Sequence, residues 1–584
     1  MKLGHDVPST QPVSTRRTQP MLTKRTYVAS LAIISATGLT YLLSSGAQVA
    51  VAQFSNRASG TTPSFAGASI RQSQAMRRFR DPRPSAQQTP SAIQQFSTDS
   101  DPSGKVATFQ PGGATTTANN AFFQDLGTNG RTCLSCHQPQ EGWGISAAGV
   151  KARFAQSGGT EPIFRLVDGA TCPTDPVDTL AQRQQAYKLL TNHGLIRIGL
   201  QIPANAEFEV TNVKDPYNCT TNPETGLTSP TTGIVSVYRR PLPSTNLGFL
   251  SARMWDGREP SLESQAIDAT LIHAQGQNPP TAAQVAQIVK FESGIFTAQV
   301  FDNKAGSLTA NGATGGPTAL SRELANFFIG INDPVGLNPR GIPFTSQIFN
   351  LYRPWAGGGG TAATGGTAAT GGTATGGTAT GGTSATASNA TTGSSTGTGG
   401  SGTVLATAGG VPTAIGTIAT PAQQSVARGQ AVFNDTVINI TGVSGLNDEL
   451  NQPSISGFCG TCHDTPQVGN HSVAAPLNIG IPDAAPPALN VADLPVFTLT
   501  CKSGTLAGQV FTTTDPGRAL ISGLCKDIGR FKGPILRGLA SRAPFFHNGG
   551  AATLLDVVNF YDQRFSIGFT DQQKTDLVNF LNAL

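Results

Sequence analysis

Two five-residue motifs share one pattern of cysteine and histidine: CLSCH at residues 133–137 and CGTCH at residues 459–463. The C-x-x-C-H spacing attaches haem c, because the two thiols add to the two vinyl groups of the porphyrin and the histidine binds the iron. A thioredoxin-like redox pair needs no following histidine, and a zinc site needs further cysteines or histidines at ligand spacing. We therefore predict two covalently bound haem c groups. The predicted haem-binding residues are Cys133, Cys136, His137, Cys459, Cys462 and His463.

The elements that must position these motifs look mainly helical. Helix-like segments precede both, ANNAFFQDLG before the first motif and SVARGQAVF before the second. We predict a mainly α fold in which two cytochrome c-like haem domains pack together, with long loops and a low-complexity insertion. Helices are expected to start at Thr420, Thr553 and Thr570 and to lie within residues 174–192, and short strands are expected at residues 206–213 and 232–240.

Composition divides the chain into segments of different character. Basic residues precede an apolar stretch at residues 27–43, and Ala50-Val51-Ala52 fits a signal peptidase site; an uncleaved membrane anchor is the alternative. A Gly/Thr/Ala repeat later in the chain has no apolar face to bury, which indicates a linker. The predicted segments are a signal peptide (1–52), a disordered tail (53–105), an N-terminal haem c domain (106–355), the low-complexity linker (356–417) and a C-terminal haem c domain (418–584).

The export signal predicts a periplasmic protein with no stable membrane span after cleavage, in a compartment where disulfides persist. Four cysteines lie outside the haem motifs, and their sequence-local pairs are Cys172 with Cys219 and Cys501 with Cys525. Sequence alone does not fix that connectivity. The formal charge of +5 is spread over scattered basic residues, which argues against a nucleic-acid partner.

The chain resembles the bacterial di-haem cytochrome c peroxidases and their MauG-type relatives. Besides the haem motifs, the resemblance is carried by a Trp-Asp-Gly-Arg…Ser-Leu-Glu-x-Gln-Ala pattern within residues 239–266 and a Pro-x-x-His-x-Gly pattern within residues 514–561. The resemblance implies that the haem on His137 meets peroxide or dioxygen and that the haem on His463 transfers electrons. It also implies that Trp255 lies between the two haems and that Gln265 belongs to the peroxide pocket.

The first haem pocket departs from the family pattern. The peroxidases place a catalytic glutamate ten residues after that glutamine, and here this position is Gln275, which cannot take up and return a proton. His273, two residues away, has the chemistry to do so, but a structural histidine is an equal interpretation. The long segment at residues 150–238 holds a distal ligand such as His193 or covers the haem edge. The family's calcium-binding pattern, which implies a possible calcium cofactor, is weak, because Arg240 stands where an asparagine is expected.

The second haem lacks the methionine ligand of the peroxidases, since no methionine follows His463. In the family that methionine lies fourteen residues after the histidine of the Pro-x-x-His pattern, here His547, and the corresponding residue is Tyr561. MauG-type enzymes place a tyrosine ligand there, and Tyr561 continues a helical stripe that begins at Leu554. We rank Tyr561 first as the sixth ligand and His547 second, since a bis-histidine haem occurs in the related rubber-oxygenase branch.

The resulting functional hypothesis is a periplasmic di-haem c-type oxidoreductase. It would pass electrons from a small redox donor, of the cytochrome c or cupredoxin type, through the second haem to hydrogen peroxide at the first. One alternative is an electron carrier in which both irons are six-coordinate. The other is an oxidase or oxygenase of the MauG or rubber-oxygenase kind that uses dioxygen, favoured by the missing glutamate.

Overall fold

The chain folds into helices and several small sheets joined by long loops. The computed structural model describes residues 89–219, 226–229, 232–357 and 418–584, all within one compact unit, 64–584. The predicted signal peptide, residues 53–88 of the predicted tail and all but the first two residues of the predicted linker lie outside the described residues.

All three predicted helix starts are confirmed. Thr420, Thr553 and Thr570 each accept a hydrogen bond from the backbone N–H three residues later, which caps the helix that follows. The candidate at residues 174–192 forms two short helices that meet at Tyr187. The α-helices are α3 (Ala147–Ser157), α4 (Leu180–Ala186), α5 (Lys188–His193), α6 (Leu262–Ile272), α7 (Ala282–Gly294), α8 (Pro317–Glu323), α9 (Pro421–Asp435), α10 (Ala519–Ser522), α11 (Leu554–Phe565) and α12 (Asp571–Asn582).

The strands pair into five sheets among the described residues, with orders β1-β4, β2-β3-β8-β9, β5-β7, β13-β12-β6 and β10-β11. Every pairing is antiparallel, and several join segments far apart in sequence. The strands are β1 (Ala92–Ile93), β2 (Phe96–Asp101), β3 (Gly104–Phe109), β4 (Thr115–Thr116), β5 (Ile196–Gln201), β6 (Phe208–Lys214), β7 (Ile234–Arg239), β8 (Phe296–Asp302), β9 (Gly306–Ser307), β10 (Ile438–Thr441), β11 (Ser454–Gly457), β12 (Val496–Cys501) and β13 (Val510–Thr513).

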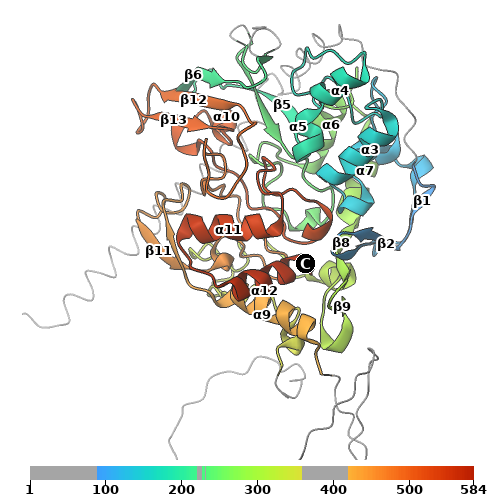
Figure 1. The fold of residues 1–584 in the computed structure, drawn as a ribbon, viewed down its shortest axis with the longest axis vertical. Helices are drawn as coiled ribbons and strands as arrows, with labels where there is room; N and C mark the ends of the chain where they lie inside the picture. Colours follow the sequence, from blue (N-terminus) through green and yellow to red (C-terminus); the bar gives the residue numbers. More distant parts are fainter. Residues whose placement is uncertain (1–88, 220–225, 230–231, 358–417) are drawn as a thin grey trace, which may run out of the picture. The chain divides into compact units, whose positions relative to one another are not determined.

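Three expectations about this architecture need correction. The fold is mixed rather than mainly α, because small sheets stand beside the helices (Figure 1). The predicted disordered tail reached residue 105, but β2 and β3 pair within residues 96–109 and β3 pairs with β8. The helix-like segment before the first motif forms two 3₁₀ turns, Thr117–Asn119 and Ala121–Phe123, rather than an α-helix.

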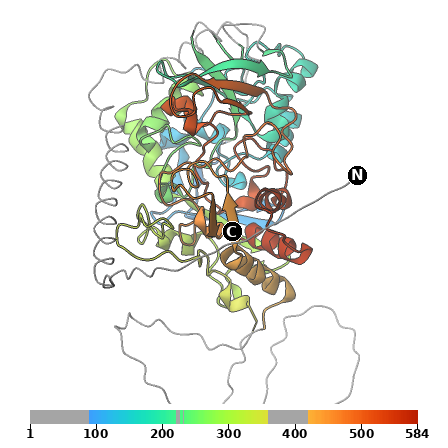
Figure 2. The same cartoon turned by 90° about the vertical axis from the view of Figure 1, so that its left-hand side faces the viewer.

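The helices near the second motif pack around a buried aromatic cluster. Phe349, Phe433 and Phe580 are buried, with ring centroids 5.3 to 5.9 Å apart, and each such burial contributes roughly 1.5–3 kcal/mol. Phe433 lies on α9 and Phe580 on α12, two helices that run side by side in Figures 1 and 2. This packing fixes the position of α9, the helix that precedes the second motif in the chain.

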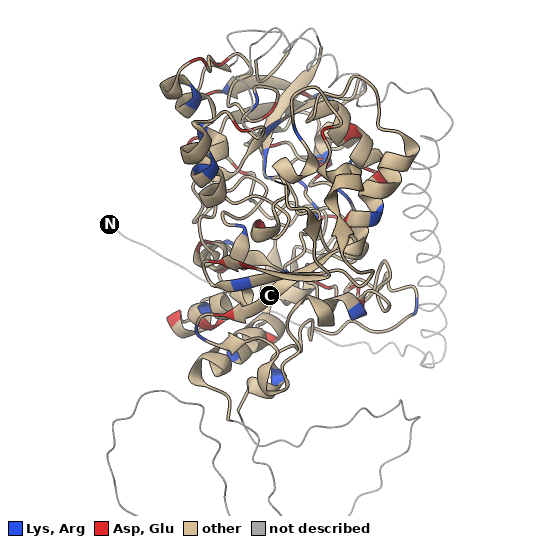
Figure 3. Ribbon diagram, turned by 90° about the vertical axis from the view of Figure 1, so that its right-hand side faces the viewer, with Lys and Arg blue, Asp and Glu red and all other residues tan. Residues whose placement is uncertain are grey.

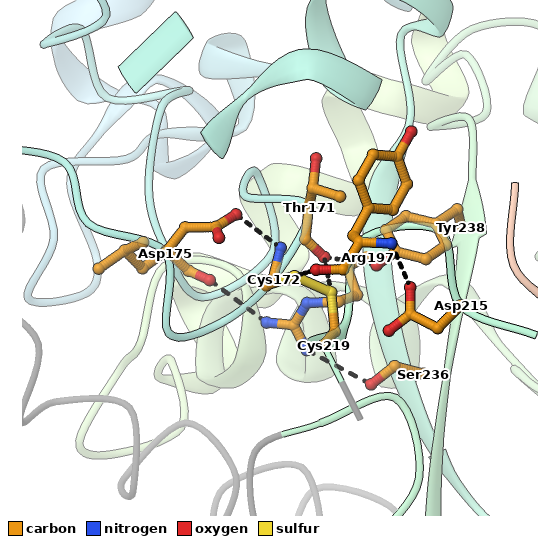
Figure 4. The surroundings of a disulfide bond; sticks show 10 residues. Thr171, Cys172, Asp175, Arg197, Asp215, Cys219, Ser236 and Tyr238 are labelled. Atoms are coloured by element: carbon orange, nitrogen blue, oxygen red, sulfur yellow. Dashed lines mark hydrogen bonds between the residues drawn. A yellow bond between two sulfur atoms is a disulfide. The ribbon is translucent and has the colours of Figure 1, made fainter. Parts of the chain in front are cut away.

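Two disulfides tie the loops around β6 and β12. Cys172 bonds to Cys219 across 47 residues, and Cys501 bonds to Cys525 across 24, so both sequence-local pairs are present. Figure 4 shows the first bridge; beside it the Tyr238 hydroxyl donates to the Thr171 carbonyl. The long segment between α3 and β7 is therefore cross-linked and folded onto the C-terminal β12.

Charged residues are dispersed over the described ribbon in the view of Figure 3. Within the described ranges, the helices are too short or too polar to cross a membrane.

Candidate functional site

The two C-x-x-C-H motifs fold into the same local structure. Each begins with one 3₁₀ turn, at Cys133–Ser135 and at Cys459–Thr461. In each turn the histidine N–H donates to the carbonyl of the first cysteine, at 3.1 Å in both cases. The four motif cysteines take no part in a disulfide. Both motifs therefore present two free thiols and a histidine in one arrangement.

Each motif histidine is oriented by a backbone carbonyl six residues later. Nδ1 of His137 lies 3.0 Å from the Trp143 carbonyl, and Nδ1 of His463 lies 2.6 Å from the Gly469 carbonyl. A carbonyl only accepts, so Nδ1 carries the proton and Nε2 keeps its lone pair for a metal. Burial lowers the pKa of both imidazoles, that of His137 to about 4, which favours the neutral, metal-binding form.

A phenylalanine from the preceding segment flanks each histidine. The ring centroid of Phe122 lies 6.3 Å from that of His137, and the ring of Phe433 lies at the same distance from His463. The likeness between the two motifs therefore extends to an aromatic ring beside each histidine. It also explains why an aromatic residue lies in both segments that precede the motifs.

Both motifs line one cavity of about 390 Å³ with largely apolar walls. All six predicted haem-binding residues face it, as do Trp255, Gln265, His273, His547 and Tyr561. Free thiols, neutral imidazoles and apolar walls are the donor set and surroundings that haem c requires. Buried polar atoms without a partner among the described residues, such as Arg240 Nε and His547 Nε2, also point to a group that belongs in this cavity.

On the side of the first motif, α6 presents Gln265 and His273 to the cavity. These residues are eight positions apart and share one helix face with Ala269, which also lines the cavity. His273 Nδ1 lies 2.6 Å from Asp168 Oδ2, and Asp168 Oδ1 lies 2.6 Å from Arg131. Burial alone would raise the pKa of Asp168, but Arg131 and His273 lower it, so the carboxylate is charged.

Gln275, the position of the missing glutamate, is directed elsewhere. It follows the end of α6 with a φ of 55°, accepts a hydrogen bond from Asn129 Nδ2 at 3.2 Å, and is not part of the cavity wall. His193, the other candidate, pairs with Asp493 at 2.8 Å and is also absent from the wall. Of the polar candidates for this pocket, the structure brings together Gln265 and His273.

Trp255 lies at the junction between the regions of the two motifs. Its indole N–H donates to the Arg240 carbonyl at 2.8 Å, and its ring meets that of His547 edge-on at 6.1 Å. Its neighbour Asp256 accepts from the fully buried Arg239, which also binds Asp515 of the C-terminal region. Burial opposes ionisation of Asp256, yet Arg258 and Arg239 lower its pKa to about 2. This ion network holds Trp255 in place.

Tyr561 and His547 occupy different parts of the cavity. Burial raises the pKa of Tyr561, and the nearby motif cysteines Cys462 and Cys459 raise it further. His547 instead stacks on Phe531, with ring centroids 3.9 Å apart. Burial lowers its pKa to about 4, and the charges that act on it are those of Asp515 and Arg239. Tyr561 is therefore the candidate nearer the second motif, and His547 is the one nearer Trp255.

The sequence did not indicate two polar residues of the cavity, Glu292 and Lys532, or Asp168, which contacts His273. Glu292 on α7 is 4% exposed, its Oε2 has no hydrogen-bond partner among the described residues, and burial raises its pKa to about 8. Its spacing from Val285 and Ile288 on one helix stripe was a signal that it points inward. Asp168 and Lys532 gave no comparable signal, because they lie in loops.

Within the described ranges, no group of three or more His, Cys, Asp or Glu side chains is placed to hold a metal ion together. The Arg240 side chain, which replaces the expected asparagine, is buried and donates to the Ile145 carbonyl.

Comparison with known proteins gives partial matches. No family model matches the chain. It is 31% identical over 143 residues to the cytochrome-c peroxidase IdrP1 of Denitromonas iodatirespirans, and 34% identical over 137 residues to IdrP2 of the same organism. Each match covers 22% of this chain and 36% of the relative, so the chain spans about a third of the length of these curated relatives.

A third curated relative, cytochrome-c peroxidase IdrP1 of Pseudomonas sp. (strain SCT), is 28% identical over 143 residues, with the same coverage. Among solved structures, a MauG-like protein associated with microbial copper homeostasis is 20% identical, with a TM-score of 0.18, over 28% of this chain and 43% of that one. The curated matches confirm the predicted resemblance to cytochrome c peroxidases.

Proposed function

We propose that this chain is a di-haem c-type oxidoreductase that reduces hydrogen peroxide at the first motif with electrons that enter at the second. The observation that carries the proposal is the single apolar cavity lined by both motifs, with both histidines held for metal binding. The partial similarity to cytochrome-c peroxidases supports the reaction class.

Haem c would be held by the two thiols and the histidine of each motif, and when bound it supplies the one-electron and oxygen chemistry. The chain's own contribution at the first motif is proton transfer. Cleavage of a peroxide O–O bond requires a group that moves a proton from one oxygen to the other. Because Nδ1 of His273 donates to Asp168, its Nε2 is the nitrogen left to accept and return that proton. Gln265, on the same face of α6, would orient the peroxide by hydrogen bonding.

At the second motif we propose Tyr561 as the sixth ligand. The influence of the motif cysteines on Tyr561 and the place of its half-buried side chain in the cavity wall support this choice over His547. A phenolate favours ferric iron, whereas the thioether of the ordinary peroxidases raises the potential. The donor, a small cytochrome c or cupredoxin, would therefore need a low potential of its own.

The proposed site of action is the periplasm. Two disulfides within the described residues support an oxidising compartment, as does the export signal read from the sequence.

An electron carrier is the second candidate. It is favoured by one observation: His273 faces the cavity on the side of the first motif, where an imidazole is also able to complete six-coordination. In that case His273 would bind iron instead of moving a proton.

The two candidates are separated by spectra of the purified protein. A pyridine haemochrome assay is expected to give two haems c per chain. The ferric and half-reduced spectra are expected to contain one high-spin haem that binds peroxide, and a reduced cytochrome c is expected to be oxidised by peroxide in steady state. Two low-spin haems in every redox state, with no peroxide turnover, would establish the carrier and refute the peroxidase.

A further inference from the structure

Three basic residues line the same cavity as Trp255. Arg240, Lys532 and Arg542 all contribute to the cavity wall. The Lys532 backbone N–H donates to the Trp255 carbonyl at 2.9 Å, and its Nζ lies 5.7 Å from the centre of the indole ring. The Trp255 indole N–H in turn donates to the Arg240 carbonyl. Lys532 and the Arg240 backbone thus contact Trp255, and the charge of Arg542 acts on both Lys532 and Arg240.

Arg240 and Lys532 are buried, 7% and 8% exposed, and Arg542 is half-buried; among the described residues none of the three has a carboxylate at ion-pair distance. Nε of Arg240 has no hydrogen-bond partner among the described residues, whereas Arg542 donates to the carbonyls of Ile535 and Arg537. Burial, and then the charge of Arg542, lowers the pKa of Lys532 to about 8 and that of Arg240 to about 9, although the charge of Glu141 acts in the opposite direction on Arg240.

Burying cations in this way destabilises the protein unless an anion pairs with them. A buried charge without a counter-ion costs several kcal/mol, and three neighbouring positive charges also repel one another. Two other buried arginines have fixed partners: Arg239 binds Asp256 and Asp515, and Arg537 donates to the Leu584 and Gln467 carbonyls. The contrast indicates that the counter-charge of the Trp255 cluster comes from the molecule that occupies the cavity.

We propose that Arg240, Lys532 and Arg542 form a carboxylate-binding site beside Trp255, and that its occupant is a propionate of the attached haem. The proposal rests on the haem attachment proposed above. Each haem carries two propionates, which are the carboxylates that attachment brings into this cavity. The site then fixes the edge of a porphyrin next to the indole that lies between the motifs. A dissolved carboxylate is the other source of the same chemistry.

The test is a Lys532→Met variant of the full-length haem protein, which removes one cation and keeps the length of the side chain and the backbone hydrogen bond. Spectroelectrochemical titration is expected to give a lower midpoint potential for one haem, because the ferrous form loses a stabilising cation. The expected effect is about tenfold in the reduction equilibrium, or roughly 59 mV for a one-electron couple. The resonance Raman band of the propionates should shift at the same time.

Two variants serve as controls. Lys532→Arg retains the charge and should keep the potential of the unmodified protein. Lys526→Met removes a lysine that pairs with Glu449 outside the cavity wall, and should also leave the potential unchanged. Equal potentials and Raman bands in Lys532→Met and the unmodified protein would overturn the proposal.

Acetate distinguishes the two sources of carboxylate. A haem propionate that fills the site leaves the potentials insensitive to added acetate. A saturable acetate effect that disappears in Lys532→Met would instead assign the site to a dissolved carboxylate and overturn the propionate assignment. The Raman and acetate measurements on the unmodified protein need no variant. Absence of haem from the purified chain would refute the proposed function itself, whereas two haems with no effect of Lys532→Met would refute this inference alone.

Discussion

Replacing Asp168 with asparagine tests the proton-transfer role of His273 most directly. Asp168 is buried between two partners, 2.6 Å from Arg131 and 2.6 Å from Nδ1 of His273. Its carboxylate fixes which imidazole nitrogen carries the proton and would stabilise the imidazolium formed when Nε2 accepts one. Asp168→Asn keeps the size of the side chain and removes the charge.

Asp168→Asn is expected to lower both the stability of the protein and its peroxide turnover. The Asp168 and Arg131 side chains are each 3% exposed, so solvent does not screen the pair. Breaking such a buried pair costs about 3–5 kcal/mol, and the low end applies because asparagine still accepts one hydrogen bond and Arg131 also donates to the Pro162 and Ile163 carbonyls. Loss of acid–base catalysis lowers peroxide turnover roughly 10²–10⁴-fold, equivalent to about 2.7–5.4 kcal/mol in the barrier.

The assay compares Asp168→Asn with His273→Gln and with a control, Asp576→Asn. Asp576 is also a buried carboxylate, paired with Arg428, but it does not line the cavity. Denaturant unfolding and kcat/KM for peroxide are measured for each variant at equal haem content. Asp168→Asn and His273→Gln should lose turnover to similar extents, and Asp576→Asn should lose only stability. Turnover within about threefold of the unmodified protein in a folded, haem-replete Asp168→Asn variant would refute the role of the pair.

Three further predictions concern other parts of the structure. Tyr561→Phe should change the spectrum of the second haem, and an unchanged spectrum would move the ligand assignment to His547. Because burial raises the pKa of Glu292 to about 8, its contribution to stability is present below its unfolded pKa of about 4.5 and is lost as pH rises through 8. Glu292→Gln should thus stabilise the protein by a few kcal/mol at pH 9 relative to pH 5 in denaturant titrations, and equal effects at both would contradict this. Paired Cys501→Ser and Cys525→Ser should lower the unfolding free energy by about 3 kcal/mol, the value for a loop of 24 residues; no change would show that the bridge does not constrain the unfolded chain.

The helices near the second motif were predictable because their signals are local. A threonine followed three residues later by a glutamine or aspartate caps α9, α11 and α12, and this chemistry involves only neighbouring residues. The sheets were harder, since β6 and β12 pair across almost 300 residues and no local pattern specifies that partner. β2 was missed for a related reason: its alternating polar residues resemble a tail until β3 and β8 supply the rest of the sheet.

The candidate site shows the same division between local and distant information. The haem motifs are contiguous in sequence, so their chemistry was readable before the fold was known. The partners of His273 are not: Asp168 lies 105 residues away, and its carboxylate becomes informative only when the fold places it against Nδ1. Gln275 was chosen by counting along the chain, but α6 ends at Ile272 and the chain then turns with a positive φ, which directs Gln275 away from the cavity.

This difference bears on how the chain compensates for the missing glutamate. A residue that replaces a catalytic group needs access to the same space, not the same position in the sequence. His273 is the C-cap residue of α6 and lines the cavity together with Gln265, although it lies two residues before the position of the missing glutamate. Its imidazole is useful there only if the tautomer is fixed, and Asp168 provides that constraint at the cost of a buried charge, which Arg131 balances. If His273 acts in this way, the three residues should depend on one another, so that Asp168→Asn has little further effect on turnover once His273 is glutamine. Additive losses in that double variant would mean that Asp168 and His273 act independently of each other.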